Sequence, residues 1–173
     1  MRLFIAIRFP DEILNALLAF QKELAACGLR GRWAPPENLH LTLAFIGEYG
    51  RPDDVTDAMA SVPFAPFSLR LDGMGRFGDL YWAGLAENRS LSGYVRGLRH
   101  ALADRGIPFD RKRFSPHITL VRKAVFLGGS VLPDATPPTG EAAIRRVSLM
   151  RSERGKNGMI YTEIGGIDGE APT

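Results

Sequence analysis

Two tetrapeptides of the same form, His-apolar-Thr-apolar, constrain the fold of this chain more than any other feature of its sequence. They are HLTL at residues 40–43 and HITL at residues 117–120, and both lie in apolar, β-prone surroundings. Side chains two positions apart in a strand point to the same face of a sheet. Each tetrapeptide is therefore predicted to place an imidazole beside a hydroxyl on one face of a strand and two apolar side chains in the core on the other.

The pairing of the two tetrapeptides is more informative than either one alone. The chain has seven threonines and three histidines among 173 residues, so chance gives two such His-x-Thr arrangements in roughly half a percent of cases. A single histidine in an apolar strand is often only a core residue bonded to a backbone carbonyl, and a threonine there often reflects β propensity. The third histidine, His100, has no threonine partner and is predicted to lie on a solvated helix face.

Two histidines and two threonines suit the hydrolysis of a phosphodiester. The reaction needs a base that deprotonates the attacking water and an acid that protonates the departing oxygen on the opposite side of phosphorus. Histidine serves either role near pH 7, and threonine hydroxyls donate to phosphoryl oxygens as charge shifts in the transition state. A metal site is the weaker alternative because no Asp, Glu or Cys stands at ligand spacing, and Cys27 is the only cysteine. We therefore expect no metal and no cofactor.

The composition is that of an ordinary globular protein with a slight basic excess. Apolar residues make up 45% and charged residues 24%, and the formal net charge is +3. Most of the basic residues are arginines, whose planar fork matches phosphate oxygens, although a GC-rich genome also raises arginine use. No apolar run is long enough to span a membrane, and the N-terminus does not read as a signal peptide. The expected location is the cytoplasm and the default expectation is a monomer.

Periodicity predicts an α+β fold in which each half of the chain holds a helix and one of the two His-Thr strands. Expected strands cover residues 2–9, 39–46, 67–71, 80–85, 115–121, 143–151 and 159–164. Expected helices cover residues 11–27, 52–62 and 91–105. Residues 30–38, 73–78, 130–140 and 152–158 are predicted to be loops or turns because they are rich in Gly, Pro or charge.

The motifs and their flanks resemble a known family. The paired tetrapeptides look like the two His-x-Thr-x motifs of the 2H phosphoesterase superfamily. Their flanks, together with the first strand, are similar to the RNA 2′,3′-cyclic phosphodiesterase family, also known as 2′-5′ RNA ligases; the matching segments are RLFIAI at 2–7, NLHLTLAFIG at 38–47 and FSPHITLVR at 114–122. The resemblance covers nearly the whole chain and is least distinctive over residues 51–110.

The family resemblance implies a bilobal α+β fold. Two antiparallel sheets related by a pseudo-twofold axis, with helices outside, would form a central cleft to which each lobe contributes one His-x-Thr-x motif. Residues 1–173 would then make a single domain of two interleaved lobes.

The same resemblance implies a reaction and residue roles. RNA 2′,3′-cyclic phosphate ends would be hydrolysed to 2′-phosphomonoesters, with His40 as proton donor to the leaving 3′ oxygen and His117 as the proton acceptor that activates water. Thr42 and Thr119 would hold the phosphate, and Arg122 matches a family arginine that contacts phosphate or supports catalysis. The two motifs have the same form, so the residues alone do not tell which histidine is the acid and which is the base.

Four further residues are candidates for substrate binding. Trp33 and Phe45 are predicted either to stack on a base or to belong to the core. Arg154 lies in a basic, Gly-containing segment that would either clamp an RNA phosphate or form a solvated hairpin turn, and Tyr161 follows it towards the cleft.

The expected partners are RNA 3′ ends bearing a cyclic phosphate, with tRNA fragments or cyclic nucleotides as narrower candidates. Three rival functions remain open at this point. The first two are reversible 2′-5′ ligation of RNA ends and hydrolysis of small cyclic nucleotides. The third is a non-catalytic nucleotide-binding module on the same fold, which the two intact motifs disfavour.

Overall fold

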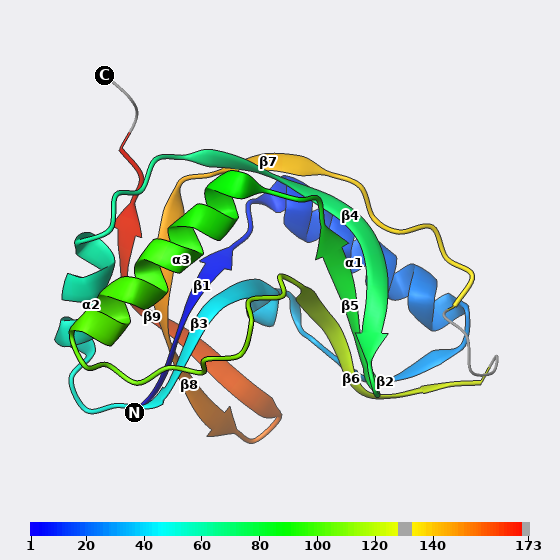
Figure 1. Ribbon diagram of the computed structural model, residues 1–173. Helices are drawn as coiled ribbons and strands as arrows, with labels where there is room; N and C mark the ends of the chain where they lie inside the picture. The colour runs from blue at the N-terminus through cyan, green and yellow to red at the C-terminus, as the bar shows by residue number, and fades with distance from the viewer. Residues whose placement is uncertain (128–132, 171–173) are drawn as a thin grey trace.

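A computed structural model describes residues 1–127 and 133–170 of the protein, and within them the chain forms two antiparallel sheets and three α-helices (Figure 1). The four-stranded sheet has the order β3 (His40–Glu48), β1 (Arg2–Arg8), β8 (Arg146–Gly155), β9 (Gly158–Asp168). The five-stranded sheet has the order β2 (Leu29–Trp33), β6 (Ile118–Phe126), β5 (Leu80–Leu85), β4 (Phe67–Phe77), β7 (Glu141–Ile144). The predicted α+β class with two antiparallel sheets is confirmed.

Two of the helices connect the sheets, because each follows a strand of one sheet and packs on the other. Helix α1 (Asp11–Ala26) follows β1 of the four-stranded sheet, yet its apolar face, including Leu17 and Phe20, packs into the core of the five-stranded sheet. Helix α3 (Arg89–Asp104) follows β5 of the five-stranded sheet and packs on the four-stranded one. Figure 1 shows α1 alongside β4 to β6, and α3 with the shorter α2 (Pro52–Ala60) on the other side of the molecule. The core of each sheet therefore includes a helix that follows a strand of the other sheet.

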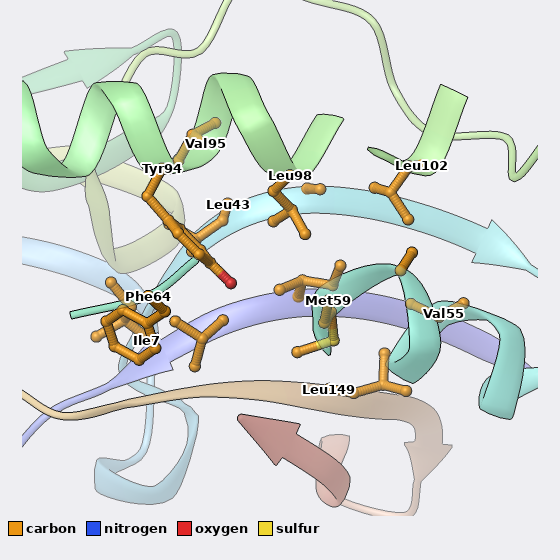
Figure 2. Packing of buried hydrophobic residues seen from close by; sticks show 14 of the residues in the cluster. Ile7, Leu43, Val55, Met59, Phe64, Tyr94, Val95, Leu98, Leu102 and Leu149 are labelled. Carbon is orange, nitrogen blue, oxygen red and sulfur yellow. The ribbon is translucent and has the colours of Figure 1, made fainter. Parts of the chain in front are cut away.

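The larger core lies between the four-stranded sheet and the helices α2 and α3. Figure 2 shows Tyr94 and Leu98 of α3 facing Met59 of α2 and Leu149 of β8, with Leu43 of β3 between the layers. The Tyr94 hydroxyl is directed into this cluster, and no hydrogen-bond partner for it occurs among the described residues. Burial raises the pKa of Tyr94 to about 12.

One predicted loop is wrong, because residues 30–38 contain strand β2 and a 3₁₀ turn at Pro36–Asn38. The sequence of β2, LRGRW, is not typical of a strand, because it contains two arginines and a glycine. Gly31 is required there, since a Cβ at this position would lie 2.8 Å from the carbonyl oxygen of Arg122 on β6. The close approach of the two backbones is a long-range contact that the local sequence does not reveal.

Three predicted boundaries also shift. Strand β6 begins at Ile118 rather than at residue 115 and continues to Phe126, and β4 extends through the expected turn to Phe77. The expected loop at 152–158 is mostly strand, because β8 and β9 pair up to Gly155 and Gly158. Part of the predicted loop at 130–140 lies outside the described residues. Across the described ranges, no helix has the length and apolar character needed to cross a membrane.

Candidate active site

The two His-Thr tetrapeptides lie on different sheets, one at the start of β3 and the other at the start of β6. Leu41 and Leu43 are fully buried, as are Ile118 and Leu120, whereas both histidines and both threonines are only partly buried. The predicted division between core face and polar face is therefore confirmed for both motifs. It follows that each sheet presents one imidazole and one hydroxyl away from its own core.

Both imidazoles are held by the same backbone contact. His40 Nδ1–H donates to the carbonyl oxygen of Asn38 at 2.7 Å, and His117 Nδ1–H donates to the carbonyl oxygen of Ser115, also at 2.7 Å. A carbonyl oxygen only accepts, so Nδ1 carries a hydrogen in each ring and Nε2 is the nitrogen free to exchange a proton. The Thr42 hydroxyl lies 2.9 Å from His40 Nε2, which makes His40 and Thr42 a hydrogen-bonded couple.

Each imidazole also rests against aromatic rings from its own sheet. His40 lies edge-on to Tyr161, with ring centroids 5.3 Å apart, and is tilted against Phe4 at 5.0 Å. His117 lies edge-on to Phe77 at 5.0 Å and is tilted against Trp82 at 6.3 Å. Such contacts restrict ring rotation and supply a partly apolar environment on one side of each histidine.

A backbone irregularity follows each motif and repeats in both sheets. The register between β1 and β3 shifts so that Leu43 and Ala44 are both buried in the core, and the register between β5 and β6 shifts so that Leu120 and Val121 are both buried. Each β-bulge reverses the alternation of faces beyond it. Phe45 and Arg122, five residues after their respective histidines, therefore return to the face that carries the histidine.

The electrostatic environment distinguishes His40 from His117. Burial lowers the pKa of His40 below 6.5, the positive charges of Arg122 and His117 lower it further, and the hydrogen bond to Asn38 acts in the opposite direction. The effect of His117 and Arg122 on His40 also means that these groups from the five-stranded sheet lie within electrostatic range of the four-stranded one. Charges on the five-stranded sheet thus act on His40 across the space between the sheets.

A cavity of about 870 Å³ opens between β2 and β6 of one sheet and the β8–β9 hairpin of the other. Its lining includes five cationic residues, and no acidic residue contributes to it within the described ranges; the cationic residues are Arg32, Arg122, Lys123, Arg154 and Lys156. His40 and Thr119 line the same cavity. This arrangement suits an anion whose reacting atom lies beside His40.

The structure brings most of the predicted site residues to this cavity. Trp33, Arg122, Arg154 and Tyr161 all line it. Thr42 does not, although it is bonded to His40, and His117 does not, although it is two residues from Thr119.

Phe45 is the third predicted residue that does not line the cavity, and it is bonded to neither histidine. The residue is 39% exposed, and its ring lies under the Arg2 guanidinium, with 5.5 Å between the ring centroid and Arg2 Cζ. His100, predicted on a solvated face, is exposed and lies 3.4 Å from Asp104. Among the described residues, no cluster of three or more His, Cys, Asp or Glu side chains could hold a metal ion.

Several residues at the site are not evident from the sequence. Phe4 is buried on the face of β1 that meets His40. A signal for this placement exists, because β1 is apolar at every position from Leu3 to Ile7, which indicates a strand covered on both faces. Phe77, Trp82 and Lys123 carry no such signal, since their placement depends on strand pairing and on bulges.

Comparisons with known proteins place the chain in context. A protein-family model described as LigT like phosphoesterase matches residues 7–81 and 84–161. An RNA 2′,3′-cyclic phosphodiesterase of Archaeoglobus fulgidus is 30% identical over 95% of this chain and 98% of the relative. One of Geobacillus stearothermophilus is 35% identical over 69% of this chain, a stretch that spans only 41% of that longer relative.

Solved structures agree with these matches. TT0787 of Thermus thermophilus superposes with a TM-score of 0.80 at 30% identity, covering 98% of this chain and all of the other. Escherichia coli LigT in its apo form gives a TM-score of 0.81 at 28% identity, with 96% of both chains covered. The same E. coli protein has also been solved in complex with 3′-AMP.

Proposed function

Because the chain belongs to the LigT-like phosphoesterase family, we propose that it hydrolyses RNA 2′,3′-cyclic phosphate ends to 2′-phosphomonoesters. The observation that carries the proposal is the matched pair of imidazoles, each anchored through Nδ1–H, so that Nε2 is the nitrogen that exchanges a proton. The names of the relatives supply the substrate class, and the cationic cavity beside His40 fits its charge.

The proposed reaction is a single displacement at phosphorus. Neutral His117 accepts a proton from water through Nε2, and the water oxygen forms the new bond to phosphorus. The bond from phosphorus to the 3′ oxygen breaks, and His40 Nε2–H donates its proton to that oxygen, which leaves a 3′ hydroxyl and a 2′-phosphate. General acid–base catalysis of this kind requires the two imidazoles on opposite sides of phosphorus.

The remaining residues hold the phosphate and the nucleoside in this proposal. Thr42 and Thr119 donate hydroxyl hydrogens to the non-bridging oxygens, and Arg122 and Arg154 compensate their charge. Trp33 and Tyr161 line the cavity next to these groups. They offer aromatic faces on which a base can stack.

The lowered pKa of His40 bears on its role as the acid. In the free enzyme, burial and neighbouring positive charges favour neutral His40 at pH 7. A bound phosphate anion would oppose the charge of Arg122 and favour protonation of His40. We therefore propose that His40 takes up its proton as substrate binds. The assignment of His40 as the acid and His117 as the base follows the family resemblance.

Substitution of each histidine tests the proposal. His40→Ala and His117→Ala are each expected to lower kcat/KM on a cyclic-phosphate RNA oligomer by about 100-fold or more, the range for acid–base groups. His100→Ala is the matched control, because His100 is exposed and paired only with Asp104. Chelation with EDTA is expected to leave the rate unchanged. Near-normal turnover in either active-site variant with an intact fold would exclude the proposal.

A substrate with sulfur in place of the 3′ oxygen separates the acid from the base. Sulfur leaves without protonation, so His40→Ala should recover most of its lost rate on this substrate if His40 is the acid. His117→Ala should stay impaired, because the water still needs a base. Recovery in His117→Ala instead would reverse the assignment and leave the reaction class intact.

We also propose that the enzyme works in the cytoplasm as a monomer and as one domain. The positions of α1 and α3 support the single domain, because the core of each sheet includes a helix that follows a strand of the other sheet. A reduced compartment suits the free thiol of Cys27. Analytical ultracentrifugation of the full chain tests the monomer.

A further inference from the structure

Lys123 has an unusual backbone conformation for its position in a strand. Its φ is 51°, and it is the one non-glycine residue of the described ranges with a positive φ. It follows Arg122 in β6, at the point where the register between β2 and β6 shifts. A left-handed conformation is costly for a residue with a Cβ and persists only where the surroundings enforce it.

Strand β2 and the turn between β4 and β5 restrict this conformation. Gly31 of β2 packs so closely that a Cβ would lie 2.8 Å from the Arg122 carbonyl oxygen and 3.0 Å from Ala124 Cα. On the other side, the Ala124 N–H donates to the carbonyl oxygen of Asp79 at 2.9 Å. The backbone at Lys123 therefore lies between two contacts that hold the strand on either edge.

The consequence is a doubling of positive charge on one side of β6. Consecutive residues of a regular strand point to opposite faces, yet Arg122 and Lys123 line the same cavity. Arg32 of β2, which pairs with Arg122, lines it too. Arg122 and Arg154 already suffice for the single negative charge of a cyclic phosphate, so Lys123 and Arg32 are cations in excess of what the reacting group needs.

We propose that Lys123 and Arg32 bind the phosphodiester group next to the terminal nucleotide, so that the cavity accepts an RNA strand in preference to a mononucleotide. The cavity of about 870 Å³ lies at the upper end of the range for sites that hold one small ligand. The inference rests on the proposed function for the identity of the reacting end. It adds a second anion subsite and a preference for oligomers.

The test compares two substrates across variants of one residue. A trinucleotide ending in a 2′,3′-cyclic phosphate has the upstream phosphodiester, and a 2′,3′-cyclic mononucleotide does not. Lys123→Asn removes the charge and retains a residue that tolerates the left-handed region. It should lower kcat/KM for the trinucleotide about 2- to 5-fold more than for the mononucleotide, as expected for one exposed cation–phosphate contact.

Two control variants and two further measurements make the result specific. Lys123→Arg should retain the trinucleotide preference, and Lys112→Asn, which removes a lysine outside the cavity, should not change it. The slope of log kcat/KM against log salt for the trinucleotide should decrease by about 0.7 in Lys123→Asn, the value for one phosphate contact on a single strand. Lys123→Gly should raise Tm by about 1–3 °C, because glycine relieves the strained φ.

Equal losses on both substrates, or no loss on the trinucleotide, would overturn the subsite. If the wild-type enzyme hydrolyses neither substrate, the proposed function fails first. Binding of a trinucleotide ending in a 2′-phosphate, measured by fluorescence titration of the wild type and Lys123→Asn, then still decides the subsite. Unchanged affinity in that titration would refute it.

Discussion

Gly75 of β4 controls the environment of His117 through Trp82, and its substitution by alanine provides a demanding test of the site. A Cβ at residue 75 would lie 2.6 Å from Trp82 Cη2 and 2.9 Å from Cε2, and nearer still to Cζ2. Ordinary contact begins at 3.4 Å, so the indole must retreat by at least about 0.8 Å. Trp82 contacts both Phe77 and His117, with centroids 5.3 Å and 6.3 Å away, and the displacement therefore reaches the imidazole.

The expected cost follows from overpacking and from misplacement of a proton-transfer group. Overpacking a site of this kind lowers the free energy of unfolding by about 1–3 kcal/mol, equivalent to roughly 2–12 °C in Tm for a domain of this size. A shift near 1 Å in a catalytic group costs up to about 100-fold in rate. We expect Gly75→Ala to lower kcat/KM by about 10- to 100-fold at a temperature where the protein remains folded.

The assay combines hydrolysis of a cyclic-phosphate oligomer with thermal unfolding and tryptophan fluorescence. Gly93→Ala is the matched control, because Gly93 is exposed on α3 and a Cβ there meets nothing within 4 Å. That variant should gain about 0.4–1 kcal/mol and retain full activity. If Gly75→Ala changes the fluorescence of Trp82 yet keeps activity within twofold of the wild type, the aromatic support of His117 has no role in catalysis.

Two further predictions concern charge and the core. Arg122→Gln should raise the pKa of His40 towards 6.5, since burial lowers that pKa first and the Arg122 charge lowers it further; an NMR titration of the His40 ring hydrogens measures the shift. Because folded His40 binds a proton less readily than unfolded His40, wild-type stability should fall as pH decreases below 6.5, and the variant should lose less over the same window. Tyr94→Phe should raise the free energy of unfolding by about 1 kcal/mol, since it removes the buried Tyr94 hydroxyl, which has no partner among the residues described; chemical denaturation checks this, with activity unchanged.

The motif strands are well predicted from the sequence because their information is local. A period of two places His40 and Thr42 on one face and Leu41 on the other, and the structure agrees. The same period predicts the wrong face for Arg122. In a regular strand Val121 would face the cavity and Arg122 the core, whereas the structure shows the reverse. The bulge at Leu120 and Val121 reverses the phase, and only the family resemblance directs attention to Arg122.

Residues brought in by strand pairing cannot be predicted in this way. The sequence of strand β2 is typical of a loop, so Arg32 has no place in the predicted site, although it pairs with Arg122. Trp82 pairs with Thr119 across β5 and β6, and Phe77 follows only because β4 runs further than expected. Each of these placements depends on which strands are neighbours in the sheet, and neighbours distant in sequence leave no local pattern.

The near-symmetry of the site makes its small asymmetries chemically important. Each imidazole is held by the same kind of backbone contact, a hydrogen bond from Nδ1–H to the carbonyl oxygen two residues earlier. Hydrolysis nevertheless needs one imidazole to give a proton and the other to take one. What differs is their surroundings: His40 is bonded to the Thr42 hydroxyl and lies against buried Phe4, whereas His117 rests on Phe77, which is 48% exposed. Charges act on the buried His40 imidazole over a lower effective dielectric than in water, so a nearby anion affects its protonation strongly. A phosphate bound beside His40 would thus favour its protonation, and substrate binding itself would prepare this imidazole for the proposed role of acid, which the backbone geometry alone does not decide.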